Sequence, residues 1–572
     1  MFALNAMLIT VPSRRKLIED VRPQGATRWM TVQILLFDAA VLGALACVVG
    51  LVLGDVLSLV VFHAAPGYLS FAFPVGSERI VMWQSVALSV AAGLVAAVLG
   101  VLWPLRDVLV SPLQAKQSAA GGSRRWTLVR LGAGLLALGL TILIVLVDPR
   151  AASLGDLTLI TALVCLLPFM FDALVTLFEA LQRPFNGASP IIAVTELRTP
   201  PTRVRSLAIA ATAAIAVLGT VAVQGSQANL QRGLDASAHG IDSGADVWVT
   251  PRGESNAFAT TPFQALNLGS LTRLPSVRAV GLYRGSFLDW GDRRLWILAP
   301  PSTSRQPIPP GELQAGNLAL ARARVRSGGW AVLSQALAAE HHLQIGQPFT
   351  LPAPRPLSLR VAALSTNLGW PPGAIILSSA TYARAWGSGA PSAYEIQSAA
   401  GASPTAARDE VQRVLSSHPG LAVETAAERE QLHYTLASQG LSRLTEIRLL
   451  VLIAAVLAVA GALGSMIWQR RDLVAFIKCE GYRRGVLWRW LCCESALLIV
   501  SGSAIGALFG LVGQLVVSHA LASATGFPIS LGVEGLAALS SFALVSIVAV
   551  AIVSLPGFLV VRVPPRAISP SY

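Results

Sequence analysis

Charged residues are scarce in this sequence, since Asp, Glu, Lys and Arg together make up only 13% of the chain. An ordinary soluble domain has about a quarter of its residues charged. Hydrophobic residues, by contrast, make up 54% of the chain. The composition therefore excludes an ordinary soluble protein and favours a membrane protein.

Lysine is almost absent, and its positions exclude one class of enzyme. A Walker A loop needs a Gly-Lys pair to hold the phosphates of a nucleotide. The only lysines are Lys16, Lys116 and Lys478, and none of them follows a glycine. The chain therefore cannot be a P-loop ATPase, and we expect it to bind no cofactor of its own.

Cysteine is also scarce, and none of the five cysteines lies in the long polar stretch 226–445. That stretch has no disulfide framework, although a domain of its length buries a sufficient core without one. Its adjacent His341 and His342 point in different directions and have no third ligand at a suitable spacing, so we expect no metal site. Ser334 and Ser365 lack the glycine pattern of a nucleophile elbow, so we expect no hydrolase.

Long apolar runs are what the sequence does contain. A helix that crosses the hydrocarbon core of a bilayer needs about 20 predominantly apolar residues, and the sequence predicts about eight such spans. The predicted spans are 31–54, 83–105, 128–147, 157–181, 206–225, 446–468, 489–517 and 534–561.

Between the fifth and sixth spans, charged and turn residues reappear at the density of a globular domain. Short alternating patterns there predict strands, and one segment has a helical pattern. The expected strands are 246–250, 295–298, 357–362 and 374–377, and the expected helix is 404–417. The predicted fold class is a polytopic α-helical membrane protein with about eight spans and one α+β extracytoplasmic domain.

Positive charge is confined to alternate segments between the spans, which determines the expected orientation. Arginine and lysine cluster in 14–28, 106–125, 183–205, 470–489 and 562–566. The positive-inside rule therefore predicts a cell-membrane protein with both termini in the cytoplasm and residues 226–445 outside. The net charge of +13 follows from this topology, so we expect no nucleic-acid partner.

Two distant parts of the sequence repeat one pattern at a constant offset. Each has a basic segment, a turn glycine, a span with one acid near its start, an outer loop and a second span that ends near prolines. The recurring pairs are Arg14 and Arg470, Arg15 and Arg471, Gly25 and Gly481, Arg28 and Arg484, Asp38 and Glu494, Gly50 and Gly506, and Gly54 and Gly510.

The paired pattern resembles the FtsX-like permease family, the MacB or type VII class of ABC transporters. The C-terminal module of that family looks like RR-x-L … G-x-x-R-R … E-x-x-x-L … G-x-x-x-G … P-x-x-x-A, and the resemblance covers both repeats. It implies a non-catalytic permease subunit that couples ATP hydrolysis by a separate ATPase to movement of its external domain. The exported substrate would be a lipid, lipoprotein, peptide or drug.

The resemblance also implies partners. These are a cytoplasmic ABC ATPase, expected as a dimer that binds ATP and Mg, a second permease copy or half, and membrane lipids. It divides the chain into an N-terminal coupling segment 1–28, a first module 29–115, three further spans in 116–225, the external domain 226–445 and a second module 446–572. Long members carry further segments before the first module, whereas Met1–Ile9 is an apolar stretch too short to span. We therefore expect that the true start of the protein lies upstream of Met1 or that another chain supplies the missing part.

Both basic segments are expected to form amphipathic helices that couple the ATPase to the spans. The alternative is that they only anchor the chain by the positive-inside rule. The expected coupling residues are Arg14, Arg15, Gly25, Arg28, Arg470, Arg471, Gly481, Arg483 and Arg484.

Inside the spans, Asp38 and Glu494 are costly charges that we expect to pair with an arginine or a helix end. A proton relay is the less favoured alternative, because it needs a chain of such groups. Small residues at a spacing of four permit close helix packing. That role is expected for Gly50, Gly54, Gly506 and Gly510.

Two other functions stay open at this point. One is an antimicrobial-peptide sensing or resistance permease that signals to a histidine kinase. The other is a secondary transporter, which is disfavoured because few polar groups lie in the spans and a large external insert has no role in that mechanism. Association with an ATPase distinguishes both ABC functions from the secondary transporter.

Overall fold

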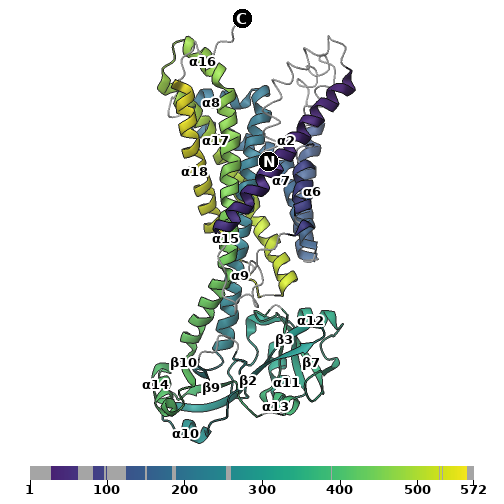
Figure 1. Ribbon diagram of the computed structural model, residues 1–572, viewed down its shortest axis with the longest axis vertical. Helices are drawn as coiled ribbons and strands as arrows, with labels where there is room; N and C mark the ends of the chain where they lie inside the picture. Colours follow the sequence, from purple (N-terminus) through teal and green to yellow (C-terminus); the bar gives the residue numbers. More distant parts are fainter. Residues whose placement is uncertain are drawn as a thin grey trace.

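The protein is an elongated molecule in the computed structural model, with a helical bundle at one end and an α+β domain at the other (Figure 1). The structure describes residues 27–61, 82–98 without 85, 96 and 97, 124–147, 151–182, 188–252, and 259–562 without 371, 388, 527 and 531. Two long helices, α9 (Pro200–Asp242) and α15 (Ala426–Gln469), join the bundle to the domain.

The bundle is built from apolar helices. Besides α9 and α15 it contains α2 (Arg28–Val61), α6 (Arg124–Val147), α7 (Ala152–Gln182), α8 (Ala188–Arg198), α16 (Arg471–Cys479), α17 (Arg484–Thr525) and α18 (Gly535–Arg562). Within the described residues, seven helices are long and apolar enough to cross a membrane: α2, α6, α7, α9, α15, α17 and α18.

The span expected at 83–105 lies partly outside the described residues. Its described part contains an apolar helix at Val86–Val95, which is too short to cross a bilayer. A total of eight spans therefore remains a prediction.

Helix α17 is the central helix of the bundle, since 61% of its most apolar window is buried, whereas the corresponding value for α2 is 12%. Its side chains share a core with α7, α9, α15 and α18, including Leu498 and Phe509 of α17 and Phe171 of α7. The outer surface of α2 instead exposes large apolar side chains such as Phe37 and Val52. That surface suits contact with lipid or with another helix.

Glycines on one face of α17 allow α9 to approach it closely. A Cβ atom at Gly502 would lie 2.5 Å from the carbonyl oxygen of Ala210, and one at Gly506 would lie 2.3 Å from the carbonyl oxygen of Ala214. At Gly510 the nearest atom would be a side-chain carbon of Val221, at 2.7 Å. Any side chain at these positions would force the two backbones apart.

Both connecting helices extend far beyond the apolar bundle. At 1.5 Å per residue, a helix of 43 residues such as α9 is about 65 Å long. That is about twice the thickness of a hydrocarbon core of about 30 Å. The domain boundaries expected at 226 and 445 both fall inside these continuous helices.

The α+β domain contains one mixed sheet of ten strands in the order β10-β1-β9-β2-β3-β8-β5-β7-β4, with β6 paired to β7. The strands are β1 (Val247–Pro251), β2 (Val277–Trp290), β3 (Arg293–Ala299), β4 (Leu313–Ala315), β5 (Trp330–Ser334), β6 (Pro348–Leu351), β7 (Leu357–Ser365), β8 (Ala374–Ile376), β9 (Ala393–Ser398) and β10 (Leu421–Thr425). The α-helices of the domain are α10 (Leu268–Thr272), α11 (Leu318–Ser327), α12 (Gln335–Glu340), α13 (Ser379–Trp386) and α14 (Pro404–Val414).

Four strands and one helix expected from the sequence are present, as β1, β3, β7, β8 and α14. The long strand β2 connects two lobes, because its first half pairs with β9 and its second half with β3. One lobe packs α10 and α14 against β1, β9 and β10. The other lobe surrounds β3, β5, β7 and β8 with α11, α12 and α13.

The connecting helices enter the domain through neighbouring strands. Strand β1 follows α9, β10 precedes α15, and the two strands pair antiparallel from Val247↔Thr425 to Pro251↔Leu421. The ends of α9 and α15 at the α+β domain are thus held together by the pairing of β1 with β10. A change in the relative position of the two helices must therefore be transmitted to the sheet.

We predict that Gly506→Val destabilises the bundle, because its side chain would collide with the backbone of α9. Overpacking of a close interface costs about 1–3 kcal/mol. The thermal unfolding midpoint of the purified protein in detergent should fall. Gly464→Val is the matched control, since no atom lies within 4 Å of a Cβ there. Equal midpoints for the two variants would contradict the close packing of α17 and α9.

Candidate functional site

A sharp corner lies at the end of the bundle away from the α+β domain, where α15 ends, α16 turns and α17 begins (Figure 1). Arg470 is the N-cap residue of α16. Gly481 lies between α16 and α17 with a φ of 94°, which residues with a Cβ rarely adopt. No atom lies within 4 Å of a Cβ at Gly481, so the backbone conformation and not the available space requires glycine there.

A buried ion pair fixes this corner. Nη2 of Arg470 lies 2.5 Å from Oε1 of Glu494, which is completely buried in α17. The other terminal nitrogen of the guanidinium is 3.6 Å from Oε1 of Glu196 on α8, and the guanidinium carbon is 5.5 Å from the centroid of the Trp490 ring. One arginine therefore connects α8 and α17 at the point where α15 turns into α16.

The two faces of α16 have different surroundings. Val474 is buried in a small core with Leu487 and Trp490 of α17. On the other face, Leu473 and Phe476 are 37% and 63% exposed. An exposed apolar surface of this kind marks a contact with another protein or with a membrane surface.

Positive charge borders this exposed face. Arg483 and Arg484 are exposed at the start of α17. Burial, and then the charge of Arg484, lower the pKa of Lys478. We call Leu473, Phe476, Lys478, Arg483 and Arg484 the α16 surface. Its combination of apolar and basic groups suits a partner with apolar and acidic side chains.

At the other end of the connecting helices, a second buried charge cluster joins α9 and α15. Asp242 at the end of α9 is buried, with Oδ1 2.9 Å from Nε of Arg429 and Oδ2 2.5 Å from Nδ1 of His433. The Arg429 guanidinium carbon lies 4.8 Å from the centroid of the Trp248 ring, and Nε1 of Trp248 donates to the carbonyl oxygen of Asp242 at 3.0 Å. These contacts bind both helix ends to β1.

Two buried carboxyl groups lie close to this junction. Burial raises the pKa of Glu395 to about 8, although a hydrogen bond from Ser304 and the charge of Arg429 oppose the shift. Burial also raises the pKa of Glu312, which accepts a hydrogen bond from the hydroxyl of Thr366. The carboxyl group of Glu395 thus keeps its proton at neutral pH.

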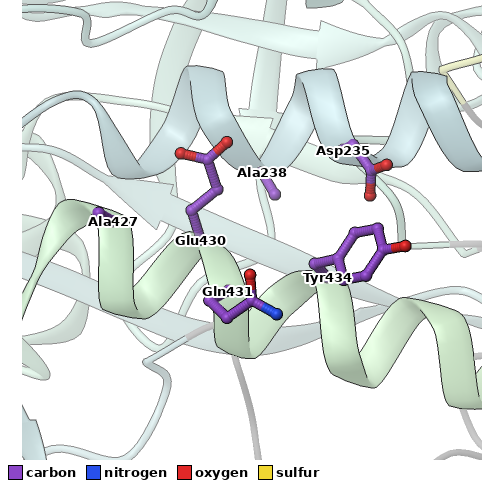
Figure 2. Close-up of a pocket in the computed structure, with 6 residues that line it drawn as sticks. All are labelled: Asp235, Ala238, Ala427, Glu430, Gln431 and Tyr434. Atoms are coloured by element: carbon purple, nitrogen blue, oxygen red, sulfur yellow. The ribbon is translucent and has the colours of Figure 1, made fainter.

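Beside the junction, α9 and α15 line a cavity of about 250 Å³. Figure 2 shows the residues that line it: Asp235, Ala238, Ala427, Glu430, Gln431 and Tyr434. Nδ1 of His239 and Oε2 of Glu430 are 3.0 Å apart across the two helices. The described residues contain no group of three or more His, Cys, Asp and Glu side chains that could hold a metal ion.

A further contact reaches the α+β domain from α17. The backbone N–H of Asn367 donates to the carbonyl oxygen of Gly526 at 2.7 Å. Gly526 caps the end of α17 with a φ of 65°, and a Cβ there would lie 2.3 Å from the Asn367 side chain. Helix α17 thus contacts the domain directly.

Comparison with known families matches the two repeated modules. The family of the FtsX-like permease C-terminal domain matches residues 1–112 and 447–565. Both repeated modules of the chain thus match the FtsX-like permease family. The comparison with curated proteins found no match. Permeases of this family are membrane subunits of ABC transporters and generally work with a cytoplasmic ATPase, and they are generally not catalytic themselves.

The residues singled out in the second module of the permease lie in two places. Arg470, Gly481, Arg483 and Arg484 gather at the corner, and Arg471 is the first residue of α16. Glu494 joins this group as the ion-pair partner of Arg470, which is the kind of pairing expected from the sequence. Farther along α17, Gly506 and Gly510 face α9.

The corresponding residues of the first module are only partly described. Arg14, Arg15 and Gly25 lie outside the described residues, and Arg28 is the first residue of α2. Asp38 is half-buried in α2. Among the described residues, no atom lies within 4 Å of a Cβ at Gly50 or Gly54. The coupling and packing roles of this module therefore remain predictions.

Several residues of the site were not predicted from the sequence. Glu196 could have been noticed, because it is the only acid in the basic segment 183–205. Asp242, Arg429 and His433 gave no such signal, since Asp242 is far along the chain from the other two and the folded structure brings the three together.

We predict that Arg470→Met destabilises the permease by about 3–5 kcal/mol, because it leaves Glu494 buried without its ion-pair partner. Glu494→Leu in the same chain should restore most of the loss, since the double variant buries no charge. Thermal unfolding of the single and double variants measures the coupling. A double variant that is no more stable than Arg470→Met would rule out the ion pair as the cause.

The raised pKa of Glu395 predicts a pH-dependent stability. Between about pH 4.5 and about pH 8 the folded protein keeps a proton that the unfolded chain releases, so stability falls as the pH rises through this window. The loss should amount to a few kcal/mol. Glu395→Gln cannot ionise and should remove this slope, as measured by unfolding midpoints on both sides of the window.

Asp289→Asn is the control for this measurement, because Asp289 is an exposed acid of β2. It should leave the pH dependence of the unfolding midpoint unchanged. An unaltered slope in Glu395→Gln would show that another group causes it.

Proposed function

We propose that this permease is the transmembrane subunit of a MacB-type ABC transporter whose separate ATPase docks on the α16 surface. ATP and Mg would be bound by that ATPase, because the chain has no Gly-Lys pair. The exposed side chains of Leu473 and Phe476, bordered by basic groups, support docking of a protein at this surface. The match of both modules to the FtsX-like permease family supports an ATPase as that partner.

The continuous course of α15 is the observation that carries the proposal. This helix runs for 44 residues from β10 of the α+β domain to the turn at Arg470. Because helices are stiff over this length, a displacement at the α16 surface reaches the sheet without an intervening loop. The Arg470–Glu494 ion pair connects the same displacement to α17, which packs against α9.

The proposed cycle is mechanical. Closure of the ATPase would move the ends of α15 and α17, shift α15 relative to α9, and thereby change the orientation of the α+β domain. The cavity between α9 and α15 supports a relative shift of these helices. We infer that this movement exports a lipid, lipoprotein, peptide or drug from the side of the membrane that holds the domain.

The proposed orientation places the α+β domain outside the cell membrane and the α16 surface in the cytoplasm. The arginines of segment 470–489 support this assignment through the positive-inside rule. A second permease copy or half and membrane lipids would cover the exposed apolar surface of α2. The small buried share of that helix supports such a contact.

Substitutions in the corner test the coupling. Gly481→Val keeps all charges but places a β-branched residue at a φ of 94°, a strain of about 1–3 kcal/mol. We predict that the variant inserts normally and loses affinity for the ATPase by about tenfold. Replacing both Arg483 and Arg484 by Lys should also weaken binding, because lysine lacks the forked donor geometry.

The measurement is the stimulation of ATP hydrolysis and the binding affinity when the ATPase is added to the permease in nanodiscs. Gly535→Val is the matched control, because Gly535 begins α18, has no positive φ and has no atom within 4 Å of a Cβ. Full stimulation and binding in both corner variants would contradict docking of the ATPase on the α16 surface. The basic residues there would then serve only as membrane anchors.

A further inference from the structure

The second lobe of the α+β domain has a strongly one-sided charge. Between residues 313 and 394, Glu340 is the only acid, and its Oε2 lies 2.5 Å from Nε of Arg293. The same stretch carries no lysine but contains Arg322, Arg324, Arg326, Arg355, Arg360 and Arg384. A soluble surface usually mixes both signs of charge, so this excess of arginine points to an anionic partner.

Two of these arginines lie over the ring of one tryptophan, and a third reaches the turn that precedes it. The guanidinium carbon of Arg324 on α11 lies 4.3 Å from the centroid of the Trp330 ring, and that of Arg360 on β7 lies 6.0 Å from it. Strand pairing sets Trp330 opposite Arg360. Arg384 on α13 reaches the turn before β5, where its Nη2 would lie 3.3 Å from a Cβ at Gly328.

The guanidinium groups of this cluster are available for a ligand. Arg360 and Arg384 are exposed, and Arg324 is half-buried. None of the three forms an ion pair with a carboxylate of the described residues. Their fixed contacts are the Trp330 ring for Arg324 and Arg360 and Oγ1 of Thr381, at 3.4 Å, for Arg384. The cluster is thus held in place by an aromatic ring and a hydroxyl, with its charge uncompensated.

An apolar side chain extends the same surface. Leu320 on α11 is 48% exposed and lies one turn from Arg324 on the same side of the helix. We call Leu320, Arg324, Trp330, Arg360 and Arg384 the Trp330 patch. Arginine, tryptophan and an adjoining aliphatic side chain make up a surface with the residue types that anchor protein interfaces.

The position of the patch argues against the lipid headgroups of the permease's own membrane. Figure 1 shows α11 and α13 on the side of the α+β domain that lies away from the helical bundle. Guanidinium forks match carboxylates in a bidentate manner, while Trp330 and Leu320 need an apolar partner. A ligand that offers only charge would leave the apolar part of the surface unused.

We propose that the Trp330 patch docks an acidic segment of another protein that also carries apolar side chains, in the compartment of the α+β domain. The carboxylates would bind Arg324, Arg360 and Arg384, and the apolar side chains would cover Trp330 and Leu320. The proposal does not depend on ATPase coupling, because the patch lies in the domain and not at the α16 surface.

Peptide binding to the full-length permease in phosphatidylcholine nanodiscs tests the proposal. The probes are fluorescein-labelled peptides of equal length made of Glu and Leu, of Lys and Leu, and of Glu alone. The Glu-Leu peptide should bind most tightly by fluorescence anisotropy, and its affinity should fall as salt is added. Arg360→Gln should weaken it about tenfold, since the variant loses a hydrogen bond to a charged group.

Two further variants distinguish binding at the Trp330 patch from attraction by the overall positive charge of the domain. Arg413→Gln removes a positive charge from an exposed position of α14 in the other lobe and should leave the affinity unchanged. Arg360→Glu should reverse the preference, so that the Lys-Leu peptide binds better than the Glu-Leu peptide. Equal weakening by Arg360→Gln and Arg413→Gln would overturn the assignment of the site.

The remaining outcomes also decide between ligands. Equal affinity for the Glu-only and Glu-Leu peptides would overturn the proposal that the patch binds a protein segment with apolar side chains. It would indicate that any polyanion binds there. Arg360-dependent binding of phosphatidylglycerol vesicles without binding of the Glu-Leu peptide would overturn it in favour of a membrane. ATPase stimulation serves as a separate measurement, because loss of peptide binding with intact stimulation affects only this proposal.

Discussion

The close approach of α17 and α9 is the contact on which the rest of the molecule depends. It exists because Gly502, Gly506 and Gly510 present no side chain where the backbone of α9 passes. In a lipid environment helices gain little from hydrophobic burial against one another, so close packing of this kind supplies much of their association. It fixes α9, which leads to the α+β domain, against the central helix of the bundle.

Buried ion pairs lie near both ends of α15. At one end Arg470 joins Glu494, and at the other Asp242 joins Arg429 and His433. A buried ion pair contributes little net stability, but breaking it is costly, so it favours one geometry over its neighbours. Directly beside the second cluster, α9 and α15 line a cavity of about 250 Å³.

Hydropathy located the seven described long helices well, because burial in lipid is a local property of each segment. It placed the end of the fifth span at 225, whereas α9 continues to Asp242. After residue 225, polar residues such as Gln227 and Asn229 lower the hydropathy without ending the helix. The alternation of apolar and polar residues predicted β1, β3, β7 and β8. It did not predict which strands are neighbours in the sheet, because those neighbours come from distant segments of the chain.

The sequence by itself determined the membrane class, the repeated module, the family and the lack of a nucleotide-binding loop. All of these are properties of neighbouring residues or of patterns at fixed spacing. The tertiary structure alone decided that Glu494 pairs with Arg470, that Asp242 meets His433, and that Arg324 and Arg360 lie over the ring of Trp330. Which buried charge finds which partner depends on distances between elements, and those distances are set only when the helices and strands pack.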